Sequence, residues 1–219
     1  MRILARACSD IVTKVSQRTT RHLYSPRMFP GRSWLVPILV MLGLMLSAAS
    51  LEHRMGRRLW GVPNTPGIWS GDIWSRYNSQ FVSDPYSFTH VTHGVVFYGL
   101  STLLFPKSSL QTRLMVAVAA ESAWEVLENS DAVINRYRTE TISLEYFGDS
   151  IVNSMSDILF CITGFFIASR LPKRATIAGT VALEVILALW IRDNLTLNII
   201  MLVFPIDAVK AWQMGIKGI

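Results

Sequence analysis

The chain has 219 residues, of which 51% are apolar and 16% are charged, whereas an average soluble domain carries about 25% charged residues. This composition excludes an intrinsically disordered chain, which is poor in hydrophobic residues, and two cysteines are too few for a disulfide-stapled secreted domain. The net charge of +6 comes from the first 32 residues, which contain seven Lys and Arg and one Asp. The rest of the chain is neutral overall and shows no recognisable nucleic-acid-binding module, so we expect no nucleic-acid partner.

Residues 1–32 are predicted to form a basic, poorly ordered tail in the cytoplasm, which lies on anionic lipid and sets the membrane topology. Five apolar segments follow, each close to the length of about 20 residues that a helix needs to cross a bilayer. They are residues 33–51, 88–105, 110–129, 149–169 and 175–191. A further apolar stretch, residues 195–206, is too short for an ordinary span. The predicted fold of residues 33–219 is therefore an all-α transmembrane bundle of about five spans, within a range of about four to six.

The Lys and Arg residues of the loops predict the orientation of this bundle. With the N-terminus in the cytoplasm, the cytoplasmic side carries twelve of them and the opposite side carries seven, which is the bias expected of a multi-pass inner-membrane protein. The loop at residues 52–87 then lies outside, and it is rich in Trp, Tyr and Phe. Two interpretations of this loop stay open. It rests on the membrane surface, as interfacial aromatic residues do, or it forms a lid over the interior of the bundle.

Ionisable side chains interrupt the predicted spans at helical spacing. Residues three, four, seven or eight positions apart share one face of a helix, so four of the spans each present a polar stripe. The stripe of residues 175–191 and the polar break after it is Thr176, Thr180, Glu184 and Arg192. The other three stripes are His90 and His93; Glu121, Glu125 and Glu128; and Asp149, Asn153 and Asp157. Because ionisable groups at membrane depth usually face a protein interior, we predict that these three stripes line a polar cavity open toward the periplasm, together with Asn129, Arg192 and Asp193. Asp149, which follows Gly148, is also predicted to cap its helix.

Carboxylates that cluster in a low dielectric either hold protons or are compensated by a cation. One interpretation makes Glu121, Glu125 and Asp157 catalytic acids or bases. A second places a divalent metal on His90, His93 and Glu125, since His and carboxylate side chains on facing helices ligate first-row metals. A third is purely structural, with nearby arginines neutralising the acids and locking the bundle. Those arginines are Arg136, Arg138 and Arg192.

Three motifs carry a resemblance to a known family. They read H-x-x-H from His90, E-x-x-x-E-x-x-E-N from Glu121 and G-D-S-x-x-N-S-x-x-D from Gly148. Together with their flanking segments they resemble a bacterial inner-membrane family of unknown function over residues 33–213. A more distant similarity is to VanZ-like membrane proteins, in which His, Glu and Asp or Asn also recur on successive helices. The resemblance implies membrane localisation and topology, and it supplies no activity and no catalytic residue.

Three functions are compatible with this pattern. The first is a membrane-embedded enzyme that acts on a lipid or envelope substrate. The second is a structural or partner-binding membrane protein. The third is a small proton-coupled transporter with Glu184 as the inward relay, although the sequence shows no inverted repeat. In each case the immediate partner of the chain is the lipid bilayer.

Overall fold

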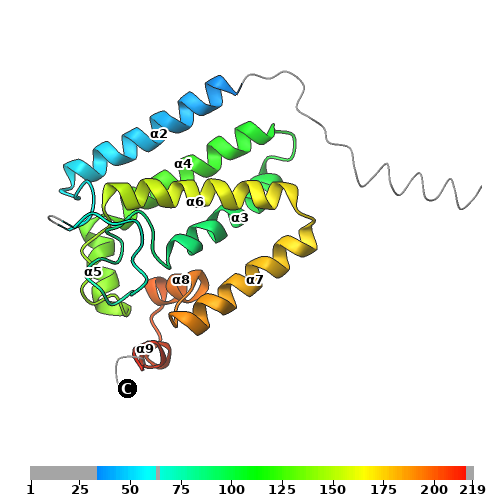
Figure 1. The fold of residues 1–219 in the computed structure, drawn as a ribbon. Coiled ribbons are helices and arrows are strands. Elements are labelled where there is room, and N and C mark those ends of the chain that lie inside the picture. Colours follow the sequence, from blue (N-terminus) through cyan, green and yellow to red (C-terminus); the bar gives the residue numbers. More distant parts are fainter. Residues whose placement is uncertain (1–33, 63–64, 216–219) are drawn as a thin grey trace, which may run out of the picture. The chain divides into compact units, whose positions relative to one another are not determined.

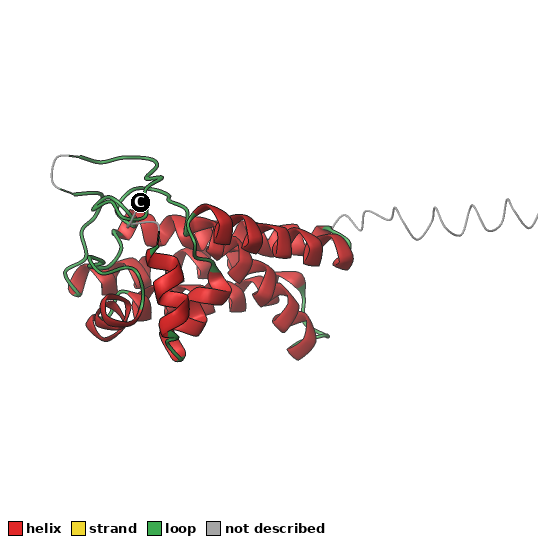
Figure 2. Cartoon of the chain, turned by 90° about the horizontal axis from the view of Figure 1, so that it is seen from below, coloured by secondary structure: helices red, strands yellow, loops and turns green. Residues whose placement is uncertain are grey.

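The structure is a computed structural model that describes residues 34–62 and 65–215. Within these residues the fold is all-α, as predicted, with eight helices (Figures 1 and 2). Their bounds are α2 Leu35–Arg54, α3 Ser87–Leu104, α4 Leu110–Glu128, α5 Asp131–Glu140, α6 Ile151–Arg170, α7 Lys173–Trp190, α8 Leu195–Val203 and α9 Asp207–Met214. The predicted basic tail, residues 1–32, lies outside the described residues.

Helices α3 and α6 form the most extensive helix pair of the bundle, and α2 and α4 pack beside them (Figure 1). Two glycines allow the close approach of α3 and α6. A Cβ atom added to Gly94 would lie 1.9 Å from the carbonyl oxygen of Cys161, and one added to Gly164 would lie 2.0 Å from that of Val91. Small residues at a helix crossing let the backbones come this close. The crossing brings the polar stripes of α3 and α6 next to each other.

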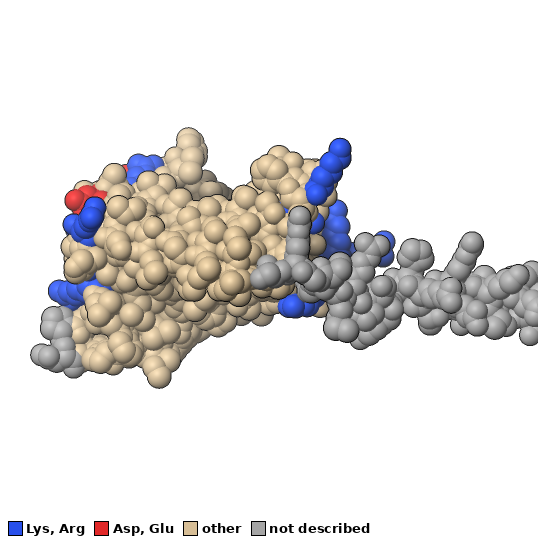
Figure 3. Space-filling model, turned by 90° about the horizontal axis from the view of Figure 1, so that it is seen from above, with Lys and Arg blue, Asp and Glu red and all other residues tan. Residues whose placement is uncertain are grey.

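Large apolar side chains lie on the surface as well as in the core, and several acidic side chains are buried. Apolar residues of α2 and α7 point outward, with Leu35 62% exposed and Leu189 79% exposed, whereas Glu121 and Glu125 are completely buried. On the face shown in Figure 3, Lys and Arg side chains gather at the two ends and a wide uncharged band lies between them. Large exposed apolar surfaces fit contact with lipid or with another protein.

Composition supports fewer membrane spans than the five predicted. Helices α2 and α6 are long and apolar enough to cross a membrane, and α7 with α8 counts as a third candidate if this pair, bent by 71°, is one broken span. Helices α3 and α4 occupy the predicted positions but do not meet the same apolarity criterion. The reason is their polar content, since α3 carries two histidines and α4 carries three glutamates.

Three further features differ from the predictions. Helices α5 and α9 are not predicted from the sequence, because neither is a long apolar segment. The predicted loop at residues 52–87 is shorter at both ends, since α2 continues to Arg54 and α3 begins at Ser87. Ser150, and not Asp149, caps α6, since its side-chain oxygen accepts a hydrogen bond from the Asn153 N–H at 3.2 Å.

The loop between α2 and α3 is tied to the start of α6. Its backbone carbonyls accept the first free N–H groups of that helix: Ser79 accepts from Ser150 at 2.8 Å and Arg58 accepts from Ile151 at 2.9 Å. Helix N-termini leave such donors without partners within the helix. Gly148, with φ at +92°, provides the turn that leads into this junction. The loop is therefore held across the end of the bundle where the polar side chains gather.

Candidate functional site: a buried His and carboxylate cluster beside a cavity

The centre of the site is a contact between two histidines of α3 and one glutamate of α4. The Nδ1 atom of His90 lies 2.6 Å from Oε1 of Glu121, and Nδ1 of His93 lies 3.0 Å from Oε2 of the same carboxylate. The spacing of three residues places both imidazoles on one face of α3, and their ring centroids are 4.9 Å apart. A proton on each Nδ1 atom, or a cation shared by the three side chains, makes these contacts attractive.

Two further carboxylates surround His90. Oε1 of Glu125 lies 3.3 Å from its Nδ1 atom, and Oδ2 of Asp157 lies 3.9 Å from its Nε2 atom. Neither oxygen of Glu125 has a hydrogen-bond partner, and Oδ1 of Asp157 also lacks one. An ionised carboxylate buried without donors is strongly unfavourable. The cluster therefore needs protons or a bound cation to balance its charge.

The geometry of the cluster provides two sets of metal-ligating atoms. One set is His90, His93 and Glu121, and the other is His90, Glu125 and Glu128; the ligand atoms of each set lie within 4.8 Å of one another. The predicted ligand set, His90, His93 and Glu125, is therefore neither of these two sets. Glu121, and not Glu125, contacts both histidines. Imidazole nitrogens and carboxylate oxygens are the usual ligands of divalent first-row metals.

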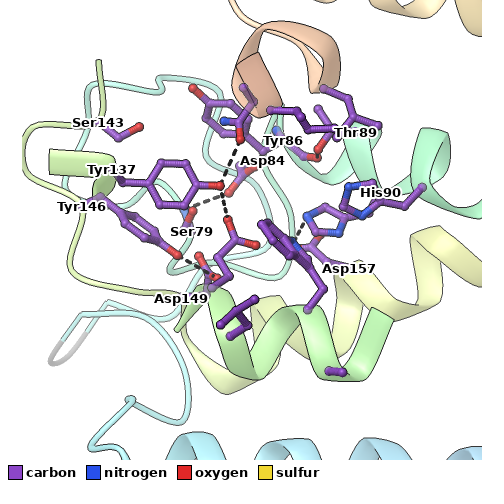
Figure 4. A pocket seen from close by; sticks show the side chains of 18 of the residues that line it. Ser79, Asp84, Tyr86, Thr89, His90, Tyr137, Ser143, Tyr146, Asp149 and Asp157 are labelled. Carbon is purple, nitrogen blue, oxygen red and sulfur yellow. Dashed lines mark hydrogen bonds and ion pairs between the residues drawn. The ribbon is translucent and has the colours of Figure 1, made fainter. Parts of the chain in front are cut away.

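A cavity of about 550 Å³ lies beside the cluster. Figure 4 shows its side chains converging from the loop before α3, from α3, from the segment after α5 and from α6. Its ionisable wall residues are Asp84, His90, His93, Glu128, Asp149 and Asp157. Among the described residues that line it, none is Lys or Arg. The wall is thus mainly acidic, and His90 and His93 are the basic side chains among its described residues.

Tyrosine hydroxyls supply several of the hydrogen bonds in this wall. Tyr137 donates to Oε1 of Glu128 at 2.7 Å, and Tyr146 donates to Oδ2 of Asp149 at 3.0 Å. Asn129 also donates to Oδ2 of Asp149, at 3.1 Å. Burial raises the pKa of Asp149 to about 7, and the charge of Asp84 adds to the shift, while the hydrogen bonds from Tyr146 and Asn129 offset part of it.

The opposite side of the cavity is apolar and reaches the surface of the bundle. Val96 of α3, Leu127 of α4 and Ile199 of α8 line the cavity, and they are 44%, 52% and 49% exposed. The same residues are therefore both cavity wall and outer surface. An opening of this kind admits a molecule that has an apolar part.

Several predicted cavity residues lie outside the wall. The described residues that line the cavity do not include Glu121, Glu125, Asn129, Asn153, Arg192 or Asp193. Asn129 and Asp193 do not line the wall but form hydrogen bonds with residues that do. Asn129 holds Asp149, and Asp193 accepts a hydrogen bond from the Tyr86 hydroxyl at 3.2 Å. Arg192 points elsewhere and donates to the backbone carbonyl of Trp212 at 2.8 Å.

The predicted neutralisation of the acids by arginines is wrong for the described part of the chain. Arg136 donates to the carbonyl of Leu202 and pairs with Glu140 at 3.3 Å. Arg138 donates to the carbonyl of Tyr146. In residues 34–62 and 65–215, no Lys or Arg forms an ion pair with an acid of the cluster or of the cavity wall. The arginines stabilise loops and helix ends instead.

Sequence reasoning missed part of the wall. Asp84, Tyr86, Tyr137 and Tyr146 line the cavity but lie outside the predicted spans. Because no periodicity links residues of loops and short helices to a face of the bundle, spacing could not select them. The loop residues Ser79, Asp84 and Tyr86 also show that the loop closes one side of the cavity, which favours the lid interpretation (Figure 4).

Comparison with known proteins gives consistent matches over most of the chain. A family model described as "Protein of unknown function (DUF2585)" matches residues 52–215. A UPF0314 protein of Rhizobium meliloti is 50% identical over 180 residues, which cover 82% of this chain and 91% of the relative. A UPF0314 protein of Brucella anthropi is 43% identical over 85% of this chain and 94% of the relative. A UPF0314 protein of Paracoccus denitrificans is 42% identical over 89% of this chain and 100% of the relative.

No solved structure matches the chain, and the distant similarity to VanZ-like proteins stays a prediction. The predicted resemblance to a bacterial family of unknown function is confirmed at the level of the family itself. The family model covers helices α3 to α9 and the His and carboxylate cluster. The chain belongs to the DUF2585 family of unknown function, to which its UPF0314 relatives point.

Proposed function

We propose that this protein is an integral inner-membrane enzyme that holds a divalent metal at His90, His93 and Glu121 and acts on an amphiphilic lipid or envelope substrate. The observation that carries the proposal is the joint position of two features. A buried His and carboxylate cluster adjoins a cavity whose other side is apolar and exposed. A reaction on a molecule with both a polar and an apolar part needs a site of this kind.

A membrane location is supported by the outward apolar surfaces of α2 and α7 and by the buried acids. In the proposed topology α3 and α4 also cross the bilayer, because their histidines and glutamates face the interior of the bundle and not lipid. The excess of Lys and Arg supports a topology with the N-terminus in the cytoplasm and the cavity toward the periplasm.

A divalent cation fits the cluster on chemical grounds. Bound to His90, His93 and Glu121, it would offset the negative charge of the buried carboxylates nearby, among them Glu125, whose oxygens have no hydrogen-bond partner. A metal of this kind supplies a Lewis acid and lowers the pKa of a bound water. Asp157 lines the cavity and Glu125 lies behind it, and an oxygen of each is within 4 Å of His90. In the proposed reaction they hold or move a proton through this contact.

The alternative functions receive less support. For the proton-coupled transporter, the predicted relay Glu184 accepts hydrogen bonds from the backbone N–H and hydroxyl of Thr196, at 3.0 and 2.8 Å. It holds the start of α8 and is not among the described cavity residues. For the structural alternative, the described arginines do not neutralise the acids.

The first test is elemental analysis of the detergent-purified protein. We expect about one equivalent of a divalent first-row metal in the wild type and a large loss in Glu121→Gln and in His93→Ala. Glu145→Gln, which changes an exposed carboxylate in a loop, is the matched control and should retain the metal. Equal metal content in all four proteins would contradict the ligand assignment, as would its absence from the wild type.

The second test addresses the reaction. Purified protein loaded with metal is incubated with a total lipid extract of Rhizobium meliloti, the source of one relative, and the lipids are compared by mass spectrometry. We expect a lipid class that is converted by the wild type and by Glu145→Gln but not by Glu125→Gln. The same products from wild type and Glu125→Gln, or no conversion by any protein, would contradict the enzymatic proposal.

A further inference from the structure

The cavity wall next to the cluster has a chemical character of its own. We call this part the outer wall; its members are Glu128, Tyr137, Tyr146 and Asp149. The rings of Tyr137 and Tyr146 meet edge to face, with centroids 5.1 Å apart. Each hydroxyl donates to one of the two carboxylates. Aromatic rings and carboxylates are thus combined in one small region.

This combination does not suit a metal or an anion. Asp149 belongs to neither described set of metal-ligating atoms, so the carboxylates of the outer wall are not grouped as a metal site. An anion would meet carboxylates, since no described lining residue is Lys or Arg. Organic cations are different, because they are attracted both by carboxylate charge and by the faces of aromatic rings.

The nearby arginines do not provide the missing positive charge. Arg138 donates to the carbonyl of Tyr146, and Arg57 donates to the carbonyl of Phe147. Arg58 lies over the ring of Phe147, 5.7 Å from its centroid. All three guanidinium groups are engaged behind the wall. The carboxylates of the outer wall are therefore balanced either by protons or by a cation that enters from the cavity.

We infer that the amphiphilic substrate carries a cationic amine and that the outer wall binds it. The inference rests on the proposed function, and it deepens that function by naming the substrate class. The alkyl part then lies against the exposed apolar side formed by Val96, Leu127 and Ile199. Glu128 belongs both to the outer wall and to the His and carboxylate cluster, since one of its oxygens lies within 4.8 Å of ligand atoms of His90 and Glu125. The amine therefore sits close to the reactive cluster.

The test compares two probes that differ only in their polar group, dodecylamine and dodecanol. Each is titrated calorimetrically into the metal-loaded protein in a non-ionic detergent at pH 7.5. We expect the wild type to bind dodecylamine about tenfold more tightly than dodecanol, the size of one well-placed cation–aromatic and charge contact. Glu128→Gln and Asp149→Asn should remove most of this preference, while dodecanol binding stays unchanged.

Two controls locate the effect. Glu145→Gln removes an exposed acid outside the cavity wall and should keep the full preference. Tyr137→Phe deletes only the hydroxyl that donates to Glu128 and leaves the ring in place, so it should keep part of the preference even if Glu128→Gln fails to fold. Circular dichroism and gel filtration establish which variants are folded.

The possible results separate this inference from the proposed function. Equal affinity for dodecylamine and dodecanol overturns the inference, and so does a preference that survives in folded Glu128→Gln and Asp149→Asn. Metal content measured on the same preparations tests the proposed function independently. One equivalent of metal without an amine preference rejects only the substrate class, whereas an amine preference without metal rejects the metal centre and retains the amine site.

Discussion

At the scale of single residues, the site is defined by acids that the described part of the chain buries without Lys or Arg partners. Glu121 is compensated by two imidazoles, whereas Glu125 has no hydrogen-bond partner at all. Asp149 is intermediate, because a tyrosine hydroxyl and an amide donate to it. These three carboxylates lie within one bundle but differ in environment, and such differences are how proteins assign separate roles to like groups.

Asp149 precedes α6 and lies outside the candidate membrane spans, and it permits a prediction about pH. Burial raises the pKa of Asp149 in the folded protein to about 7, whereas the ordinary pKa of Asp is about 4. Between these two pH values the unfolded chain has released a proton that the folded chain keeps. This group's contribution to stability is therefore fully present below about pH 4 and is lost as the pH rises to 7.

The measurement is the thermal unfolding midpoint of wild type and Asp149→Asn in detergent from pH 4.5 to 8. We expect the midpoint of the variant to rise relative to that of the wild type across this range and to level off above pH 7. A constant difference between the two proteins at every pH would show that the Asp149 carboxyl does not titrate with a raised pKa.

At the scale of secondary-structure elements, the crossing of α3 and α6 decides how the site is assembled. His90 and His93 come from α3 and Asp157 comes from α6, so any change in the separation of these helices changes the distances among them. Gly94 and Gly164 set that separation, because backbone atoms of the facing helix occupy the space of a side chain. The site therefore depends on two residues that contribute no functional group to it.

Gly164→Ala tests this dependence. The added methyl group would lie 2.0 Å from the Val91 carbonyl oxygen, and overpacking of this kind typically destabilises by about 1–3 kcal/mol. Gly99→Ala is the matched control on α3, where no atom lies within 4 Å of the added Cβ. We expect a lower unfolding midpoint and reduced metal content for Gly164→Ala, with neither change in Gly99→Ala. Similar midpoints for the two variants would argue against the close crossing.

At the scale of the whole molecule, the central feature is an exterior that is more apolar than the interior. Helix α2 exposes most of its apolar length, while Glu52 near its end is fully buried. The loop at residues 55–86 closes one end of the bundle through backbone hydrogen bonds to α6. This arrangement suits a bundle that meets lipid along its sides and water at its ends.

The number of membrane spans gives a prediction at this scale. Composition alone supports two or three spans, whereas the proposed topology also includes α3 and α4. The two alternatives differ in the side on which the connection between α3 and α4 lies. If both helices cross, this connection is cytoplasmic and the loop at residues 55–86 is periplasmic.

Single-cysteine labelling of intact cells with a membrane-impermeant maleimide distinguishes these alternatives. In a background with Cys8→Ser and Cys161→Ala, we expect Arg76→Cys to be labelled from outside and Lys107→Cys to be labelled only after lysis. Both positions are exposed. Labelling of both from outside would mean that the hairpin of α3 and α4 does not cross the bilayer.

The sequence by itself determined the all-α class, the positions of the long helices and the sharing of helix faces by the acids and histidines. These follow from apolar length and from a period of about 3.6 residues, which are local properties of the chain. The predicted segment 88–105 is α3 within one residue, and residues 110–129 correspond to α4. Short helices such as α5 were not predicted, because helices of that length depend on packing more than on pattern.

Only the tertiary structure decided which groups of the site meet. It placed Glu121, and not Glu125, between the two histidines, and it directed the arginines to backbone carbonyls. It also brought Asp84, Tyr137 and Tyr146 to the cavity from loops and a short helix. The physical reason is that spacing fixes the face of a helix but not its rotation or its distance from neighbours. Those are set by close packing at positions such as Gly94 and Gly164.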